Sequence, residues 1–182
     1  MVLFHCAAWW WRSLAPAEAD FVIQHFGEQQ GRRLVAHARL GKRRLGDTRR
    51  ALCLNGGRIS LPGVCFEAGD VTQVLRLRHP QVAGMFAHEL LHVLQRELGM
   101  AVTRQALLLQ GAYLLAGRDP YLYRTSANVR QMLRYFWAGN VEQQAQMWQD
   151  HVQAQVAGHS LPGHALLAQA VRHGRLRSRR SV

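Results

Sequence analysis

The sequence is poor in cysteine, in acidic residues and in long apolar runs, and each shortage excludes a class of protein. Its three cysteines, Cys6, Cys53 and Cys65, are odd in number and lack C-x-x-C spacing, which argues against a disulfide scaffold and a thiolate zinc site. We expect buried free thiols, with a Cys53–Cys65 bridge as the alternative in an oxidising compartment. No apolar run approaches the length that spans a bilayer.

The shortage of acidic residues leaves the chain strongly basic. Aspartate and glutamate total 11 against 23 lysines and arginines, which gives a net charge of +12. This excess predicts attraction to polyanions such as nucleic acid, an anionic membrane surface or anionic cell-wall polymer. The aromatic residues do not alternate with the basic clusters, as a stacking platform for single-stranded nucleic acid would require. These clusters are residues 32–33, 42–44, 49–50 and 172–180.

Length and composition predict one domain. A chain of 182 residues, 48% hydrophobic and 19% charged, can bury a single sizeable core. We expect an apolar arm over residues 1–12, the domain over residues 13–173 and a basic tail over residues 174–182. The arm lacks the basic start of a signal peptide, so we expect no cleavable signal.

The pattern along the chain predicts an α+β fold that is predominantly helical. A helix is expected from Ser13 to Gly27 or Gly31, followed by a strand over residues 34–40. Two apolar runs around Asn55-Gly56 predict a hairpin, and hence a small antiparallel sheet of about three strands. Beyond Pro80 we expect helices, of which the leucine-rich second one should supply core. Their ranges are 80–98, 103–116, 128–137, 141–156 and 162–173.

One short stretch, FAHELLHVLQ at residues 86–95, contains the pattern H-E-x-x-H. On a helix, His88 and His92 point the same way because one turn takes about 3.6 residues. Two imidazoles so placed can bind one Zn²⁺ at about 2.0–2.1 Å each. Glu89 lies beside them and can take a proton from water activated by the metal. The pattern is typical of metalloproteases.

The residues around this pattern favour a helix. Pro80 suits a first turn, and Gly99 suits a C-terminal stop. At about 100° per residue, the two histidines and Glu89 fall opposite a broad apolar arc. The alternative is a surface helix that carries two solvated histidines. The arc consists of Val82, Phe86, Ala87, Leu90, Leu91, Leu94 and Leu98.

A catalytic zinc site needs a third protein ligand and leaves its fourth position for water. Glu97 lies on the motif helix itself but points about 140° away. Glu142 lies in the first turn of a helix that Asn140 can cap, and the opposite stripe of that helix can pack on the motif helix. Spacing therefore favours Glu142 without excluding the others. The full set of candidates is Glu97, Asp119, Glu142, Asp150, His151, His159, His164 and His173.

Residues 86–95 resemble the F-x-H-E-x-T-H-V-x-Q core of the Vgr-related metallopeptidases, type VI secretion proteins found alone or as C-terminal extensions of VgrG spike subunits. The resemblance extends to residues 12–18, 26–27, 119–123 and 141–145. Two departures stand out. Leu91 replaces the threonine of that core, and Gln146 occupies the position where many gluzincins have an acid that orients a ligating histidine.

By position in this resemblance, Glu142 is the third ligand of one Zn²⁺ ion, beside His88 and His92, and Glu89 is the catalytic base. The family resemblance implies a gluzincin-like fold, in which a small sheet packs beside a zincin-type active-site helix and a second ligand-bearing helix. It also implies an antibacterial effector made in the cytoplasm and delivered to a competitor's periplasm. Implied partners are a peptide or protein substrate, including cell-wall peptide, and a VgrG spike, chaperone or immunity protein.

We therefore expect a zinc-dependent metallopeptidase that hydrolyses peptide bonds. The oxyanion would be stabilised by Tyr121, Tyr123, Tyr135 or His151, among which the sequence does not decide. Two other classes stay open. One is a secretion-machinery adaptor with a structural zinc site and no turnover, and the other is a basic nucleic-acid-binding protein.

Overall fold

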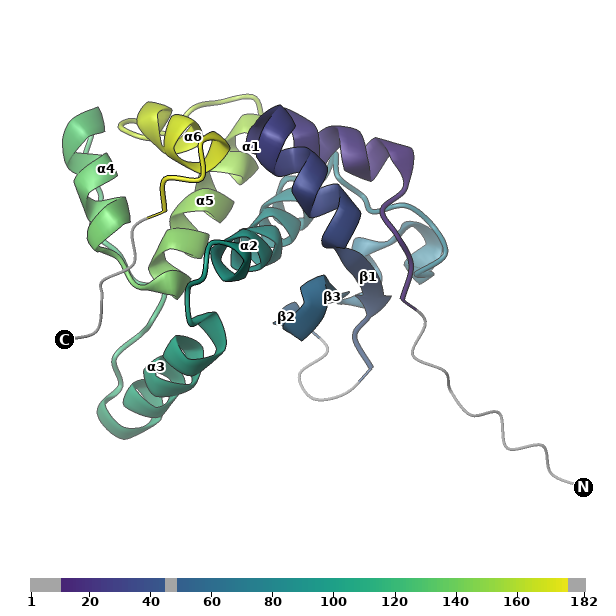
Figure 1. The fold of residues 1–182 in the computed structure, drawn as a ribbon, viewed down its shortest axis with the longest axis horizontal. Helices are drawn as coiled ribbons and strands as arrows, with labels where there is room; N and C mark the ends of the chain where they lie inside the picture. Colours follow the sequence, from purple (N-terminus) through teal and green to yellow (C-terminus); the bar gives the residue numbers. More distant parts are fainter. Residues whose placement is uncertain (1–10, 45–48, 177–182) are drawn as a thin grey trace, which may run out of the picture.

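Helix α2 (Pro80–Glu97) runs through the middle of the molecule, which a computed structural model describes over residues 11–44 and 49–176 (Figure 1). All residues of α2 from Val82 to Gln95 are buried except Met85. The prediction of a helix here is confirmed, and the alternative of a surface helix with solvated histidines is wrong. Most of the predicted arm and tail, together with Cys6, falls outside the described residues.

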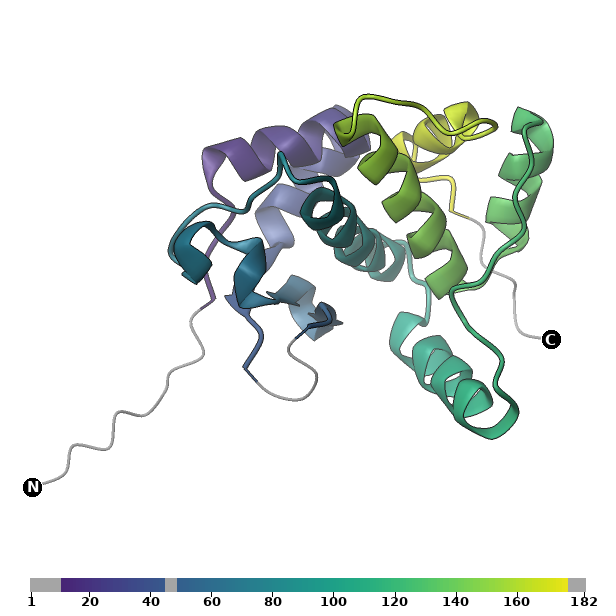
Figure 2. The same ribbon diagram turned by 180° about the vertical axis from the view of Figure 1, so that it is seen from behind.

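The chain turns helical after Pro80, as predicted. Helices α4 (Val129–Ala138), α5 (Val141–Val156) and α6 (Ala165–Arg172) lie together on one side of α2, and the sheet lies on the other (Figure 2). Helix α1 (Pro16–His37) packs against α2 and α6. Among the described residues, no helix is both long and apolar enough to cross a membrane.

The sheet has three short strands, β1 (Arg39–Lys42), β2 (Leu52–Leu54) and β3 (Arg58–Leu61), in the order β1-β3-β2. Strands β2 and β3 form the predicted antiparallel hairpin around a 3-10 turn. Strand β1 pairs with β3 in parallel, so the sheet is mixed rather than antiparallel throughout. The predominantly helical α+β class is confirmed. Short 3-10 turns at Asn55–Gly57, Gly63–Cys65 and Glu67–Gly69 complete this half of the chain.

Helix α1 begins and ends differently from the prediction. Its N-cap is Ala15 instead of Ser13, because the Glu18 carboxylate accepts the Ala15 N–H at 2.7 Å and also pairs with Arg12. At Gly27 the backbone takes a φ of +76°, yet the helix resumes and continues to His37. The strand predicted over residues 34–40 is therefore wrong for its first half. A short alternating run fits one turn of a buried helix as well as a strand.

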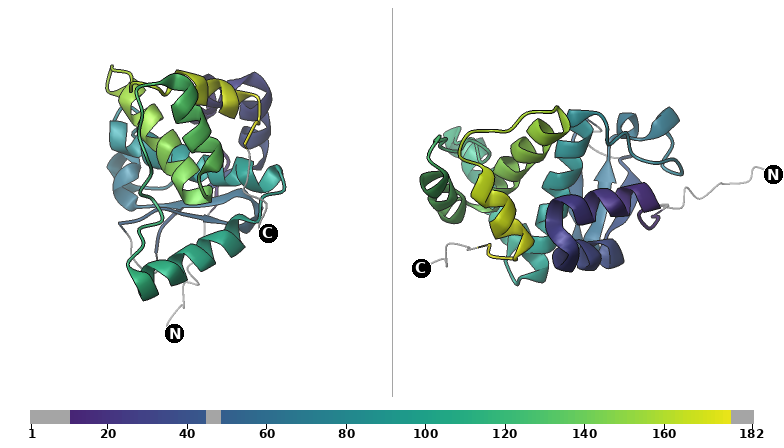
Figure 3. Two further views of the ribbon diagram at one scale, coloured as in Figure 1. Left: turned by 90° about the vertical axis from the view of Figure 1, so that its left-hand side faces the viewer. Right: turned by 90° about the horizontal axis from the view of Figure 1, so that it is seen from above.

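Helix α3 (Val102–Ala116) forms where it was predicted, but Val102 is its one buried residue and its leucines do not supply core. Four of its leucines are 64–91% exposed, and the left panel of Figure 3 shows the helix apart from the main body. Composition alone indicates that a helix is apolar, but not that another element covers it. The exposed leucines are Leu107, Leu108, Leu114 and Leu115.

Cys53 and Cys65 are both buried and unpaired, so the expectation of free thiols is confirmed and the alternative of a bridge is not. Burial raises the pKa of Cys53 to about 12 and that of Cys65 to about 11. Both thiols are therefore protonated near neutral pH and inert as nucleophiles.

Candidate metal centre

Two helices bring three potential ligands together. His88 and His92 come from the middle of α2, and Glu142 comes from the first turn of α5. Asn140 fixes that turn, because its side chain accepts the Gln143 N–H at 2.8 Å while the Gln143 side chain accepts the Asn140 N–H at 3.0 Å. The opposite stripe of α5 is fully buried, as predicted, and packs on α2. It consists of Val141, Ala145, Trp148 and Val152.

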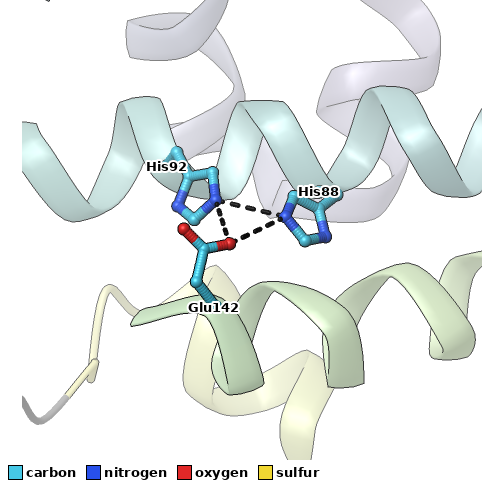
Figure 4. Close-up of side chains that lie close together, drawn as sticks. All are labelled: His88, His92 and Glu142. Carbon is cyan, nitrogen blue, oxygen red and sulfur yellow. Dashed lines mark hydrogen bonds and ion pairs between the residues drawn. The ribbon is translucent and has the colours of Figure 1, made fainter. Parts of the chain in front are cut away.

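The ligand atoms form a small triangle (Figure 4). His92 Nε2 lies 3.2 Å from His88 Nε2 and 3.2 Å from Glu142 Oε2, and His88 Nε2 lies 3.5 Å from Glu142 Oε2. A metal ion that binds three atoms tetrahedrally at about 2.0–2.1 Å holds them about 3.3–3.4 Å apart. The triangle therefore has the dimensions of one face of a tetrahedral site. Among the described residues, it is the cluster that could hold a metal ion.

A buried glutamine, Gln95, orients the His92 ring through the nitrogen that does not face the other ligands. Gln95 Oε1 lies 2.8 Å from His92 Nδ1, so that nitrogen carries the proton and Nε2 keeps its lone pair for a metal. The amide of Gln95 in turn donates to Gln144 Oε1 at 3.0 Å and to the Val141 carbonyl at 3.2 Å. This chain of hydrogen bonds ties the first ligand-bearing helix to the start of the second.

The three groups favour a cation electrostatically. Burial opposes ionisation of Glu142, but hydrogen bonds from His88 and His92 outweigh it and hold the pKa of this carboxyl well below its usual range. Burial likewise opposes a charged His92, yet the Glu142 carboxylate raises the pKa of this imidazole above its usual value. Glu142 is therefore ionised at neutral pH, and a metal ion would compete with protons for the two imidazoles.

A cleft of about 500 Å³ between β2 and α3 reaches Glu142. Tyr121 also lines this cleft, and its ring centroid lies 6.1 Å from that of His88. Arg50 Nη2 donates to Tyr121 Oη at 2.8 Å, which leaves the phenolic proton free to be donated into the cleft. Burial is the main cause that raises the pKa of Tyr121, so the phenol stays protonated.

Glu89 is buried next to His88 on α2, and its charge acts on His92 and on Tyr121. Its carboxylate is therefore near enough to the ligand triangle and to the cleft to act on them electrostatically. The three predicted ligands His88, His92 and Glu142 are gathered in one place, and Glu89 adjoins the first of them on α2.

The acidic alternatives to Glu142 lie elsewhere. Glu97 contacts His37 Nδ1 at 2.9 Å on the far side of α2. Asp119 accepts the Tyr121 N–H, and Asp150 accepts the Tyr123 hydroxyl. Tyr123 is thus turned away from the cleft. Of the four predicted oxyanion helpers, Tyr121 lines the cleft, whereas Tyr123, Tyr135 and His151 are not among its lining residues.

The histidine alternatives are also excluded as ligands of this cluster. His151 stacks between Trp148 and His164, with ring centroids 5.1 and 6.0 Å away, in a layer that also contains His25. These rings belong to the packing of α1, α5 and α6. The remaining candidates, His159 and His173, are exposed.

The residue that orients a potential histidine ligand differs from the one that the family pattern indicates. Gln146 donates to Asp150 at 2.8 Å instead of contacting a ligating histidine. Gln95, and not Gln146, makes the hydrogen bond that orients a potential histidine ligand. The sequence contained a signal for Gln95, because it follows His92 by three residues and therefore lies on the same helix face.

Comparisons with protein-family models, with curated proteins and with solved structures give no match. The assignment of this site therefore depends on its own geometry and chemistry.

Proposed function

We propose that this chain is a zinc-dependent metallopeptidase, with Zn²⁺ bound by His88, His92 and Glu142. The observation that carries the proposal is the triangle of ligand atoms 3.2–3.5 Å apart. Two imidazoles and one carboxylate are a donor set that catalytic zinc takes, and a tetrahedral ion held by them keeps one position for water. Three protein ligands suit a catalytic site, whereas a structural zinc takes four.

When bound, zinc supplies Lewis acidity that lowers the pKa of water to about 7 and polarises a carbonyl. Glu89 accepts the proton of the attacking water and passes it to the leaving amine as the C–N bond breaks. Tyr121 Oη donates a hydrogen bond to the oxygen that gains negative charge. Arg50 keeps this phenol in place through its hydrogen bond to the same oxygen.

The cleft beside the site suits an extended peptide. Strand β2 lies at the edge of the sheet and lines this cleft with Leu52, Cys53 and Leu54. An edge strand has backbone N–H and C=O groups that no further strand pairs, and a peptide can add there if it displaces side chains such as Arg96, which donates to the Cys53 carbonyl at 3.1 Å. This arrangement supports peptide bonds as the substrate class.

The resemblance to the Vgr-related metallopeptidases also supports a proposal for the biological role of the chain. On that basis the chain is a type VI secretion effector that acts on peptide in the periplasm or envelope of a competitor. The VgrG spike, a chaperone and an immunity protein are its proposed partners. The basic charge suits the anionic polymers of that compartment.

The substitution Glu89→Gln tests the proposed chemistry. It removes the proton acceptor but no metal ligand, so turnover should fall by about 10²–10⁴-fold while zinc content is unchanged. The substrates would be a broad peptide library that includes peptidoglycan stem peptides, and cleavage would be followed by mass spectrometry.

Glu97→Gln is the matched control, because Glu97 lies on the same helix but faces His37. It should cleave like the wild type. If Glu89→Gln cleaves as fast as Glu97→Gln, the role of Glu89 is wrong. If the wild-type protein binds zinc but cleaves nothing in the library, a structural zinc site in an adaptor becomes the better interpretation.

A further inference from the structure

Helix α3 carries a stripe of exposed leucines with an arginine at each end. At about 100° per residue, Leu107, Leu108, Leu114 and Leu115 fall with Arg104 within an arc of about 120°. Arg118 follows just after Gly117, where the chain leaves the helix. We call these six residues the α3 stripe.

The stripe is not covered by any other described part of the chain. Its four leucines are among the most exposed large apolar side chains of the protein. Figures 1 and 2 show α3 at one edge of the molecule in opposite views, so neighbouring helices do not shield it. An exposed apolar patch of this kind marks an interaction surface.

The positive charges beside the leucines indicate which kind of surface the α3 stripe can contact. Helix α3 contains no acidic residue, and Arg104 and Arg118 have no ion-pair partner among the described residues. In a second copy, parallel or antiparallel packing of two stripes would set arginine against arginine. The stripe therefore needs a surface that is apolar below and negatively charged at its edge, and the net charge of +12 favours the same surface.

We propose that α3 is an interfacial helix that docks the protein on an anionic lipid membrane. The helix is about 22 Å long, and it would lie in the plane of the headgroups with its leucines inserted toward the acyl chains. The two arginines would reach the phosphates from the ends of the helix. Because Leu107 also lines the cleft beside Glu142, docking brings the mouth of that cleft to the lipid surface.

Vesicle co-sedimentation with the full chain tests this docking. The wild type should bind vesicles of phosphatidylcholine mixed with phosphatidylglycerol and bind pure phosphatidylcholine weakly. Leu115→Glu should weaken binding to the mixed vesicles by roughly tenfold or more, since it removes a leucine that docking would bury among the acyl chains and adds a negative charge. Arg104→Gln with Arg118→Gln should weaken it by roughly fivefold per arginine, on the anionic vesicles only.

Val64→Glu is the matched control, because Val64 is also exposed, at 73%, and lies on a turn near the sheet. It makes the same change of charge and should leave binding nearly unchanged. Failure of the wild type to bind mixed vesicles would overturn the proposal. So would equal losses for Leu115→Glu and Val64→Glu, or a dimer in sedimentation equilibrium that Leu115→Glu dissolves. None of these outcomes depends on whether the protein cleaves peptides.

Discussion

Gln95 supports the candidate metal centre although it is not one of its three potential ligands. It is fully buried, it fixes the tautomer of His92, and it joins α2 to the start of α5 through Val141 and Gln144. His88 has no such support, since its buried Nδ1 has no hydrogen-bond partner among the described residues. The affinity of the site should therefore depend strongly on this one glutamine.

The substitution Gln95→Leu should lower zinc affinity by about 10–100-fold, because an outer partner orients the imidazole and raises its basicity. Gln146→Leu is the control that separates the two glutamines, since Gln146 donates to Asp150 and to no metal ligand among the described residues. Zinc affinity would be measured by competition with a chromophoric chelator on variants shown to be folded by circular dichroism. Equal affinities for the two variants would contradict the role of Gln95.

At the residue scale, the three α2 residues could be predicted because their spacing alone places them on one helix face. Glu142 could not be chosen from spacing, since seven other acids and histidines follow or lie near the motif. The resemblance named it, and the packing of α5 on α2 brings its carboxylate to the imidazoles. Gln146 was misassigned because the position of its partner depends on the angle between the two helices.

At the element scale, the close approach of α2 and α5 decides whether the ligands can meet. Gly84 lies in this contact, and a Cβ there would come within 3.1 Å of the Gln149 carbonyl oxygen and of the Gln153 Cβ. Glycine in the interior of a helix costs stability, so its presence here has a packing reason. A larger residue would push α5, and with it Glu142, away from the histidines.

We expect Gly84→Val to lower the free energy of unfolding by about 1–3 kcal/mol through overpacking. It should also weaken zinc binding, because the ligands belong to the two helices that it separates. Gly111→Val in α3 is the control, since a Cβ at Gly111 meets nothing within 4 Å. Urea unfolding and zinc titration of both variants measure the two effects. A Gly84→Val protein as stable as Gly111→Val would show that the helices do not approach so closely.

The elements that could be predicted are those with a strong local signal. The Asn140 cap predicts the first residue of α5, and the Asn-Gly turn predicts the β2–β3 hairpin. The parallel pairing of β1 could not be predicted, because it depends on where the chain after α1 meets the sheet. The exposure of α3 could not be predicted either, because an apolar sequence does not reveal whether another element covers it.

At the scale of the whole molecule, a second group of histidines makes stability depend on pH. His25 and His151 are buried between α1, α5 and α6, and burial lowers the pKa of each to about 4. The charge of Arg172 lowers both pKa values further, and that of His164 lowers the pKa of His151. The unfolded chain, with a histidine pKa of about 6.5, therefore binds protons that the folded protein does not.

The contribution of these two histidines to the free energy of unfolding should thus be fully present above about pH 6.5. Between about pH 6.5 and about pH 4 it should fall by about 1.4 kcal/mol per pH unit for each histidine. His151→Phe keeps a ring in the stack but removes the titrating group. Its stability should decline less steeply over this range, by about one proton. Urea unfolding at a series of pH values checks this, and parallel slopes for variant and wild type would refute it.

If two helices hold one metal ion through three side chains, the metal content of purified variants must follow the ligands. Purified wild type and Glu97→Ala should each contain about one zinc ion per chain, as measured by inductively coupled plasma mass spectrometry. His88→Ala and Glu142→Ala, verified as folded, should contain almost none, because two ligands do not hold a catalytic zinc. A folded Glu142→Ala protein that retains a full zinc ion would show that α5 supplies no ligand and that the proposed site is wrong.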